Sequence, residues 1–468
     1  MKQRISRALA FLLLLLFASA AARAGCHAVT LTGSGARSGR DWNNACAGFA
    51  GACAPQNMER GGRYYVAAGK DYPPVTFNTA ERGTERITVL RATAQEHCAD
   101  AGWRGAYDGE VRWTAPVTFA TGYWTFDGIT GEGAGTVAYG FRFVSDQARA
   151  PFLRVERQVA RQPRAITVRH VEVDGVNCCG IADTAMGVAA FYYPGDCRAG
   201  IATGEIALEY DYFHDTKRDP VLVYGVAGLL LDHVYLARNR STRENHGQGI
   251  ALTGARDVTI RNSVFEDITG TAEITFIGYC TSEKIRVYGN RFFYSQRWPQ
   301  AKGHTGVSYM FEAIGPGGSV TDLEFFQNTI AHFDRPHVLN AGFYPDVGAH
   351  GYKVFNNLWV ENSALTSAVE INGSTHDYNS LLATPLAFNW KRAGHEEVRT
   401  NDHDGLLFAD PQFHLARHTA PGKTLTEPYG LDAEGWPRGF AGREKLRPAN
   451  WDQGAFQFSP STGTNGER

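Results

Sequence analysis

The sequence predicts an all-β protein, a single-stranded right-handed parallel β-helix (solenoid) with an N-terminal cap and an irregular C-terminal covering. The composition favours many short strands joined by turns, because 43% of the 468 residues are hydrophobic, 52 are glycine and only 4 are methionine. An apolar pattern recurs at spacings suited to one solenoid turn. A second set of short strands lies between these repeats.

The recurring pattern is a hexapeptide that begins and ends with an apolar residue and often carries Asn, Ser or Asp at its fourth position. It occurs at 168–173, 208–213, 231–236, 260–265, 287–292, 325–330 and 354–359. Successive first positions lie 40, 23, 29, 27, 38 and 29 residues apart, which is one coil each with loops of variable length. Leucine-rich repeats and propeller blades would need a different template.

The second set of strands is predicted at 221–223, 250–252, 274–276, 338–340 and 369–371. Each coil then has at least two strands, and strands of successive coils stack about 4.8 Å apart. The fourth hexapeptide residue falls in a turn between strands, where polar side chains bond backbone groups. We therefore expect a structural ladder of Asp211, Ser263, Asn290, Asn328 and Asn357.

The first 24 residues predict a signal peptide, because basic residues precede a compact apolar run and the small-residue pattern Ala22-Arg23-Ala24 follows it. We expect cleavage after Ala24 and a secreted or periplasmic protein. The expected organisation is a cap with a short amphipathic helix at 25–60, the β-helix at 61–380, a covering segment at 381–458 and a disordered tail at 459–468.

The eight cysteines all follow the predicted cleavage site, and an even number in an oxidising compartment predicts disulfides. The local pairings expected are Cys46 with Cys53, and Cys178 or Cys179 with Cys197. No metal-ligand spacing is present, so we expect neither a metal nor another cofactor. The formal charge of -2 gives no basis for a nucleic-acid partner, and no segment after the signal peptide predicts a membrane span. We expect a monomer.

Several segments are similar to a known superfamily. They are DWNNA (41–45), RGGRYYVAAG (60–69), ITVLRATAQEH (87–97), TGYWTFDGITG (121–131), YGFRF (139–143) and DQGAFQ (452–457). With the coil repeat, they resemble exported bacterial right-handed parallel β-helix proteins of the pectate-lyase-like superfamily. This resemblance implies a polysaccharide partner. It leaves the chemistry open, because the superfamily includes lyases, epimerases, hydrolases and non-enzymatic surface proteins.

Ionisable residues gather just before the second strand of successive coils, beginning with the segment 214–219. Residues at equivalent places on adjacent coils lie about 5 Å apart, so these groups are expected to share one outer wall. We predict catalytic roles for Lys217, His246 and Arg243. The predicted substrate-binding residues are Arg218, Tyr212, Tyr235, Gln248, Glu273, Lys302 and His304.

The reaction that suits these groups is β-elimination or epimerisation of an anionic, uronate-containing polysaccharide. A cation (Lys217, Arg218 or Arg243) would neutralise the uronate carboxylate, and His246 or Lys217 would remove the adjacent proton. Tyr210 or Tyr212 would assist the leaving oxygen. Tyr212 and Tyr235 are the preferred pair for contact with sugar rings.

Three alternatives stay open at this stage. Glu209 and Asp232 occupy the same outward place on consecutive coils and would suit a glycosidase. A calcium site would need converging oxygens, whereas the acids expected to face outward, Glu209, Asp232, Glu266 and Asp267, are scattered. The third alternative is a non-catalytic surface or matrix protein that uses the β-helix as a carbohydrate-binding scaffold.

Overall fold

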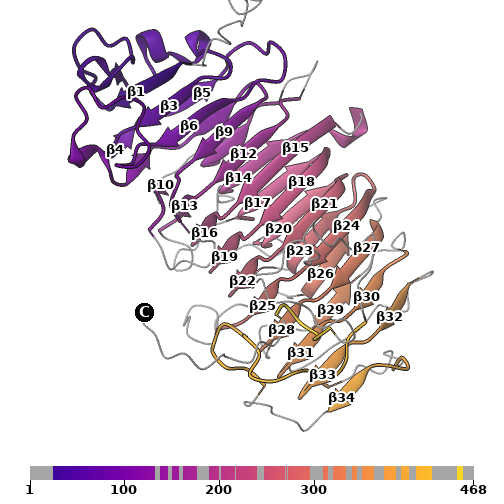
Figure 1. Ribbon diagram of the computed structural model, residues 1–468. Helices are drawn as coiled ribbons and strands as arrows, with labels where there is room; N and C mark the ends of the chain where they lie inside the picture. The colour runs from indigo at the N-terminus through magenta and orange to yellow at the C-terminus, as the bar shows by residue number, and fades with distance from the viewer. Residues whose placement is uncertain are drawn as a thin grey trace, which may run out of the picture.

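The computed structural model is a right-handed parallel β-helix built from three long sheets (Figure 1). The structure describes residues 25–131, 138–145, 150–157, 162–176, 189–199, 202–216, 218–239, 247–268, 270, 272–295, 309–314, 320–333, 340–344, 350–362, 374–385, 392–399, 407–423 and 451–456. All sheet pairings between the named strands are parallel and join equivalent strands of neighbouring coils, as shown by β12, β15 and β18.

Each coil runs through the three sheets in the order A, B, C. Sheet A contains β2 (Cys46–Ala47), β1 (Cys26–Thr30), β3 (Arg63–Val66), β6 (Ile87–Arg91), β9 (Trp124–Asp127), β12 (Ile166–Arg169), β15 (Ala202–Glu209), β18 (Val226–Asp232), β21 (Arg256–Arg261), β24 (Ser282–Tyr288), β27 (Val320–Phe326), β30 (Lys353–Phe355) and β32 (Thr375–Asp377).

Sheet B contains β4 (Gly69–Tyr72), β7 (Val111–Trp113), β10 (Phe141–Val144), β13 (Val171–Asp174), β16 (Tyr212–His214), β19 (Tyr235–Ala237), β22 (Val264–Glu266), β25 (Arg291–Phe293), β28 (Thr329–Ala331), β31 (Leu358–Val360), β33 (Ser380–Leu382) and β34 (Glu397–Arg399). Sheet C contains β5 (Val75–Phe77), β8 (Val117–Phe119), β11 (Leu153–Val155), β14 (Phe191–Pro194), β17 (Val221–Tyr224), β20 (Ile250–Thr253), β23 (Ala272–Ile277), β26 (Tyr309–Ile314) and β29 (Asn340–Tyr344).

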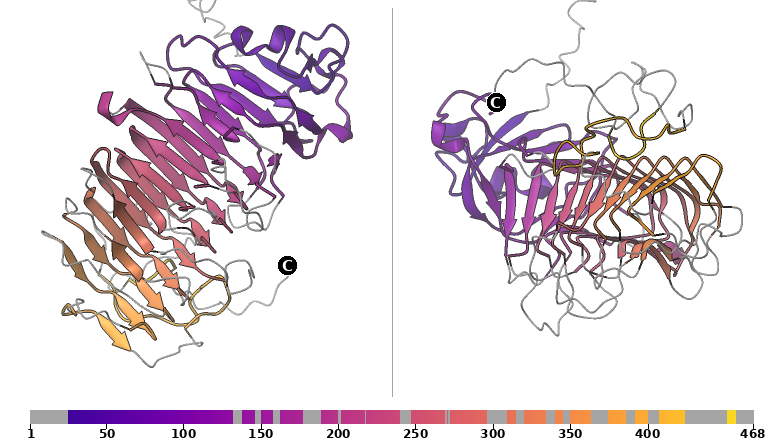
Figure 2. Two further views of the ribbon diagram at one scale, coloured as in Figure 1. Left: turned by 180° about the vertical axis from the view of Figure 1, so that it is seen from behind. Right: turned by 90° about the horizontal axis from the view of Figure 1, so that it is seen from below.

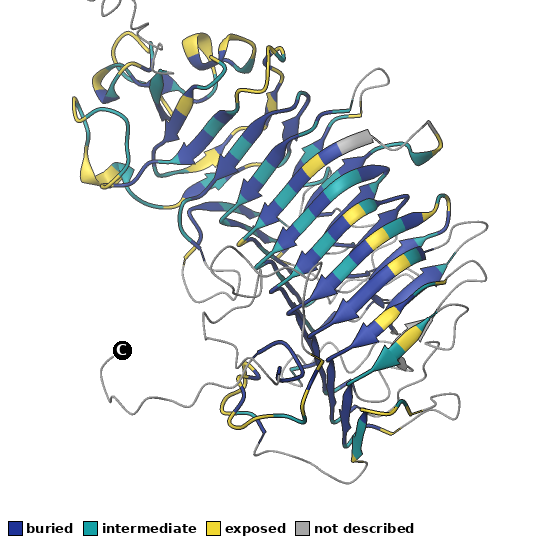
Figure 3. Ribbon diagram, turned by 45° about the vertical axis from the view of Figure 1, so that its right-hand side comes forward, coloured by how far each residue is buried: buried dark blue, intermediate teal, exposed yellow. Residues whose placement is uncertain are grey.

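The alternation of side chains explains why these short segments form strands. In β13 the two valines point into the core, while Glu172 and Asp174 point outward and are only partly buried. Because the coils stack in register, Glu172 lies beside Tyr212 and Asp174 beside His214 on the same outer face. Figure 3 shows the same alternation of buried and more exposed residues along other strands.

The predicted ladder is confirmed at the corner between sheets A and B, the A–B corner. The side-chain oxygen of Asn290 accepts the Ser263 backbone N–H at 2.9 Å, and the oxygen of Asn328 accepts the Asn290 N–H at 3.1 Å. Asn357 and then Asn379 continue the ladder with the same bonds at 3.0 Å. One rung differs, because the buried Asp211 accepts the Val171 N–H at 2.9 Å with a carboxyl oxygen instead.

The C-terminal covering lies against the outer face of sheet B from β22 onward. Leu407, Phe413 and Leu415 pack there in one buried cluster with outward residues of the sheet. Figure 2 shows the yellow C-terminal segment running alongside the orange coils. The cluster formed by the described part of this segment therefore includes later coils of that face and no residue of β10, β13 or β16.

Strands of the long sheets also lie on either side of the range 61–380 that was predicted for the β-helix. Sheet A begins at β1, inside the expected cap, and sheet B extends past residue 380 to β34. The described part of 25–60 contains no α-helix but three 3-10 helices, η1 (Trp42–Asn44), η2 (Gly51–Cys53) and η3 (Pro55–Asn57); η4 (Gly105–Tyr107) and η5 (Cys197–Ala199) lie further along. The predicted signal peptide, the strand at 369–371 and the tail at 459–468 lie outside the described residues.

Three disulfides are described, and one was predicted correctly. Cys46 pairs with Cys53, as expected from their closeness in sequence. The expected partner of Cys197 was wrong, because it bonds Cys280 over a separation of 83 residues. Cys26 pairs with Cys98, and Cys178 and Cys179 lie outside the described residues. No described helix is long and apolar enough to cross a membrane.

Candidate functional site

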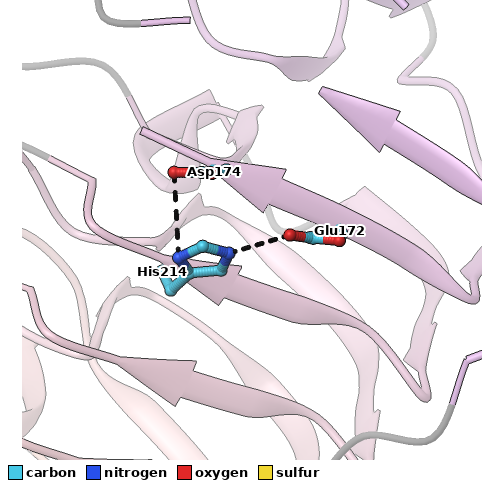
Figure 4. Close-up of side chains that lie close together, drawn as sticks. All are labelled: Glu172, Asp174 and His214. Atoms are coloured by element: carbon cyan, nitrogen blue, oxygen red, sulfur yellow. Dashed lines mark hydrogen bonds and ion pairs between the residues drawn. The ribbon is translucent and has the colours of Figure 1, made fainter. Parts of the chain in front are cut away.

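The part of sheet B that the C-terminal segment leaves open carries a group of charged side chains on β10, β13 and β16 and in the turns that follow β16 and β19. We call it the His214 cluster; its members are Arg142, Glu172, Asp174, His214, Asp215 and Arg238. They come from different coils because parallel stacking aligns the ends of the sheet B strands. Three of them are shown in Figure 4.

His214 lies at the centre of this cluster and is buried, with 8% of its side chain exposed. Its Nε2 atom is 3.2 Å from Glu172 Oε1, and its Nδ1 atom is 2.6 Å from Asp215 Oδ2. Asp174 Oδ1 lies farther away, 3.9 Å from Nδ1. A histidine that bonds a carboxylate through each nitrogen must donate through both, and only the imidazolium form can do so.

Two arginines complete the charge balance. The Arg142 guanidinium lies 3.1 Å from Glu172 Oε1 and 3.3 Å from Asp174 Oδ2. Arg238 bonds Asp215 at 2.7 Å through Nη2, an atom that also lies 2.9 Å from His214 Nδ1. Asp215 Oδ2 lies within hydrogen-bond distance of both nitrogens, so this carboxylate oxygen links Arg238 to His214.

The pKa shifts in the cluster follow from these contacts. Burial alone would lower the pKa of His214, but hydrogen bonds to Asp215 and Glu172 outweigh it and raise the pKa above the ordinary value. Burial alone would raise the pKa of Glu172 and of Asp215, but the bonds from His214 and the nearby arginines lower both. The arrangement therefore favours a positively charged imidazole and negatively charged carboxylates, and His214 can act as a proton donor.

Glu172, Asp174 and His214 also have metal-ligating atoms within 4.8 Å of one another. A divalent ion there would have to compete with Arg142, which already contacts both carboxylates. It would also require a neutral His214, contrary to the direction of its pKa shift. These contacts fit an ion-pair network better than a metal site.

Tyr212 and Tyr235 share an outward position, as predicted, and their rings stack at 4.7 Å. They stack on each other, and Tyr212 also lies 4.1 Å from the ring of His214. The Tyr212 hydroxyl accepts a bond from Arg238 at 2.9 Å, and burial raises the pKa of this hydroxyl. A sugar would therefore meet the edges of these rings more readily than their faces.

The structure describes only part of the predicted site. Arg218 lies just before β17 of sheet C, and its Nε atom is 3.5 Å from Asp219 Oδ2. Gln248 and Glu273 were expected on the outer wall, but both are buried, with 2% and 1% of the residue exposed. Burial raises the pKa of Glu273 well above its ordinary value. The predicted residues Lys217, Arg243, His246, Lys302 and His304 lie outside the described residues.

The carboxylate pair of the glycosidase alternative does lie on adjacent coils, because Glu209 is directly opposite Asp232 in the parallel register. Burial alone would raise the pKa of Asp232, but its bond from His233 and the charge of Arg261 lower it. The role of general acid in glycoside hydrolysis needs a raised pKa. Asp267, expected to face outward, is buried with 2% exposed.

Sequence reasoning singled out two of the six residues of the His214 cluster and missed the other four. His214 and Asp215 belong to the ionisable segment identified before β17, whereas Arg142, Glu172, Asp174 and Arg238 were not selected. The alternation of apolar and charged residues in 171–174 was the available signal, since it places both acids outward. Their closeness to His214 depends on a 40-residue coil, whose register the sequence leaves open.

The comparisons with known proteins support the fold. No protein-family model matches the chain, and no curated protein matches it. Among solved structures it is similar to XylC in complex with xylose, with TM-score 0.50 and 10% identity, covering 93% of this chain and 98% of that one. It also matches pectate lyase Pel9A, with TM-score 0.47 and 12% identity over 94% and 98% of the two chains.

A third match is a PL6 family polysaccharide lyase from Pseudopedobacter saltans, with TM-score 0.37 and 11% identity over 75% of this chain and 90% of that one. At such identities, likeness extends to the fold alone. The chain has a right-handed parallel β-helix, as the sequence predicts.

Proposed function

We propose that the protein binds an anionic, uronate-containing polysaccharide along the wall where the strands of sheet B end, and modifies it by β-elimination or epimerisation. The observation that carries this proposal is the His214 cluster. It combines a proton-donating imidazole, two arginines and a tyrosine hydroxyl in one partly exposed group. Clustered ionisable groups with shifted pKa values are a marker of functional sites.

In this proposal the described residues supply the acid, and the neighbouring loop supplies the base. A cation, Lys217, Arg218 or Arg243, neutralises the uronate carboxylate; His246 or Lys217 removes the adjacent C–H proton as the C–O bond breaks. His214 or Tyr212 gives a proton to the leaving oxygen, so the products are an unsaturated uronate and a free hydroxyl. In epimerisation the proton is instead returned to the same carbon from the opposite face.

The protein's compartment is part of the proposal. Disulfides form and persist in oxidising environments, and three link the described residues. They support a secreted or periplasmic protein exported by the predicted signal peptide. Extracellular polysaccharides are within reach of such a protein.

The test is a panel of uronate polymers assayed for the absorbance of the unsaturated product and, by NMR, for inverted uronate units. His214→Gln should lower kcat by about 100-fold if His214 is the acid, the usual size of a general-acid effect. The matched control is His395→Gln, because His395 is also bonded to an aspartate, at 2.7 Å, but lies near the last coil. Unchanged activity in His246→Ala would remove His246 from the mechanism.

A non-catalytic scaffold is the second candidate, and one observation favours it. The charged groups of the His214 cluster bond one another, and the rings of Tyr212 and Tyr235 stack on each other, which are contacts typical of a rigid structural network. Binding of a polymer without any product in the same panel would support the scaffold and overturn the enzyme.

A further inference from the structure

The A–B corner carries a row of aromatic rings that the proposed mechanism does not use. On three consecutive coils the residue at this corner is His170, Tyr210 and His233. Their rings stack with centroids 5.4 and 4.6 Å apart and planes within 17° and 13° of parallel. Tyr210 is 37% exposed, and the two histidine side chains are 20% and 30% exposed. We call these three residues the ring row.

The backbone at the ring row has positive φ values. His170, Tyr210 and His233 have φ values of 54°, 56° and 55°, in the left-handed region that disfavours large side chains. The next two coils meet the same requirement with Asn262 and Gly289, which adopt this conformation more easily. The corner geometry alone therefore does not require rings.

Both histidines are held in one orientation. His170 Nδ1 lies 2.7 Å from Asp127 Oδ1, and the buried Asp127 is fixed in turn by Arg169 at 2.6 Å. His233 Nδ1 lies 2.8 Å from Asp232 Oδ1, with Arg261 on the other oxygen of Asp232. A carboxylate partner makes Nδ1 the donor, so each ring is oriented by Nδ1 and keeps Nε2 for another contact.

The later coils show what this corner can hold. Gln327, which follows on the same corner, donates to the backbone oxygens of Asp452 and Gly454 at 2.8 and 3.0 Å. Asn356, two coil positions from Gly289, exchanges bonds of 2.7 and 2.6 Å with the backbone of Lys423. Corner side chains in this half thus hydrogen-bond backbone groups of two C-terminal segments, one at Lys423 and one at 452–454.

We propose that the ring row is the corresponding contact for an extended polysaccharide, which lies parallel to the solenoid axis at the A–B corner. The proposal rests on the proposed function and adds a second contact to it, at the edge of sheet B where its strands begin. Hydrogen-bonding ring edges recur at the rise of one coil, about 4.8 Å, a length comparable to one pyranose unit. Imidazole nitrogens and a phenol suit the many hydroxyl donors of a glycan.

The test measures the affinity of uronate oligosaccharides of increasing length by calorimetry. The triple variant His170→Asn, Tyr210→Asn and His233→Asn removes the rings but keeps a residue that tolerates positive φ, as Asn262 does. Long oligosaccharides should bind about tenfold more weakly to it than to the wild type, the loss expected for one or two hydrogen bonds. Short ones should lose less.

The matched control is Tyr378→Asn, because Tyr378 has φ 56° at the same corner, stacked on His395 near the last coil. It should bind as the wild type does. Equal binding by the triple variant and the wild type would overturn the ring row alone, and so would a synthetic extended peptide that binds the ring row in place of the glycan. A wild type that binds no polysaccharide would overturn the proposed function as well.

Discussion

The outer face of sheet B has two halves of the same geometry and opposite character. From β22 to β33 its outward residues include Val264, Phe293, Leu358 and Leu382, and the C-terminal segment buries them. From β10 to β16 the outward positions carry Arg142, Glu172, Asp174, Tyr212 and His214. Both halves use in-register parallel strands, so the difference arises from the outward side chains alone.

The comparison shows how a solenoid divides its surface between stability and function. Apolar outward residues would expose a hydrophobic face, so they require a covering segment. Charged outward residues need none, because they can pair with one another and remain partly exposed. In the described part of the chain, the later half is thus occupied by the protein's own C-terminal segment, and the earlier half carries a network of paired charges.

The largest expected effect is a loss of stability in the covered half of sheet B. Phe413→Ala removes a ring that packs at 5.0 Å on Phe293 and 5.1 Å on Phe408. A buried Phe to Ala change costs about 3 kcal/mol of unfolding free energy, so the denaturation midpoint should fall clearly. Tyr210→Asn in the open half should cost less than about 1 kcal/mol, since that ring is partly exposed. Equal losses for the two variants would contradict the division.

The next prediction tests how much the ladder at the A–B corner contributes to the stability of the covered half. Asn328→Ala removes the acceptor of the Asn290 backbone N–H at 3.1 Å and leaves that group buried without a partner. Such a loss costs about 2 kcal/mol. Thr259→Ala, on the outer side of sheet A, is the control and should change stability little. Wild-type stability of Asn328→Ala would show that the ladder is not needed.

The sequence could predict the periodic parts of the molecule and few of the others. The hexapeptides predicted the coils, and Asn290, Asn328 and Asn357 predicted the ladder, because both depend on local patterns repeated in register. The strands β1 and β34 lie outside the range predicted for the β-helix, in parts of the sequence where the repeated pattern is weak. The pairing of Cys197 with Cys280 depends on coil stacking, which sequence distance hides.

The candidate site was less predictable for the same reason. The stacking of Tyr212 on Tyr235 followed from aligned hexapeptides. The contact of Arg142 with Asp174, by contrast, depends on the length of the intervening loop. Whether Glu273 is buried or exposed depends on what lies over it, which no pattern in its own strand encodes.

A smaller effect on stability is predicted at the Asp211 rung of the ladder. Asp211 stands where later coils have Asn, and burial raises the pKa of its carboxyl well above the ordinary value of 3.8. Because the folded state binds the proton more tightly, wild-type stability should fall as the pH rises from 3.8 toward the folded pKa. Asp211→Asn should remove this decline and add about 1 kcal/mol at neutral pH. Thermal unfolding across pH is the measurement, and a destabilised Asp211→Asn would contradict the ladder role of this residue.

The smallest predicted effect concerns His214 in the earlier half of sheet B. As with Asp211, stability is expected to fall as the pH rises, but over a different pH range. The raised pKa of His214 means that its contribution to stability is complete below the ordinary histidine value of 6.5 and is lost as the pH rises through the folded pKa. The lowered pKa values of Glu172 and Asp215 act oppositely, since their contribution is lost only as the pH falls below their ordinary values of 4.5 and 3.8. His214→Gln should therefore flatten the stability profile above pH 6.5. A wild-type stability that instead rises as the pH approaches 6.5 from below, through a contribution lost in His214→Gln, would show that the folded protein keeps the imidazole neutral, and it would remove His214 as the proton donor.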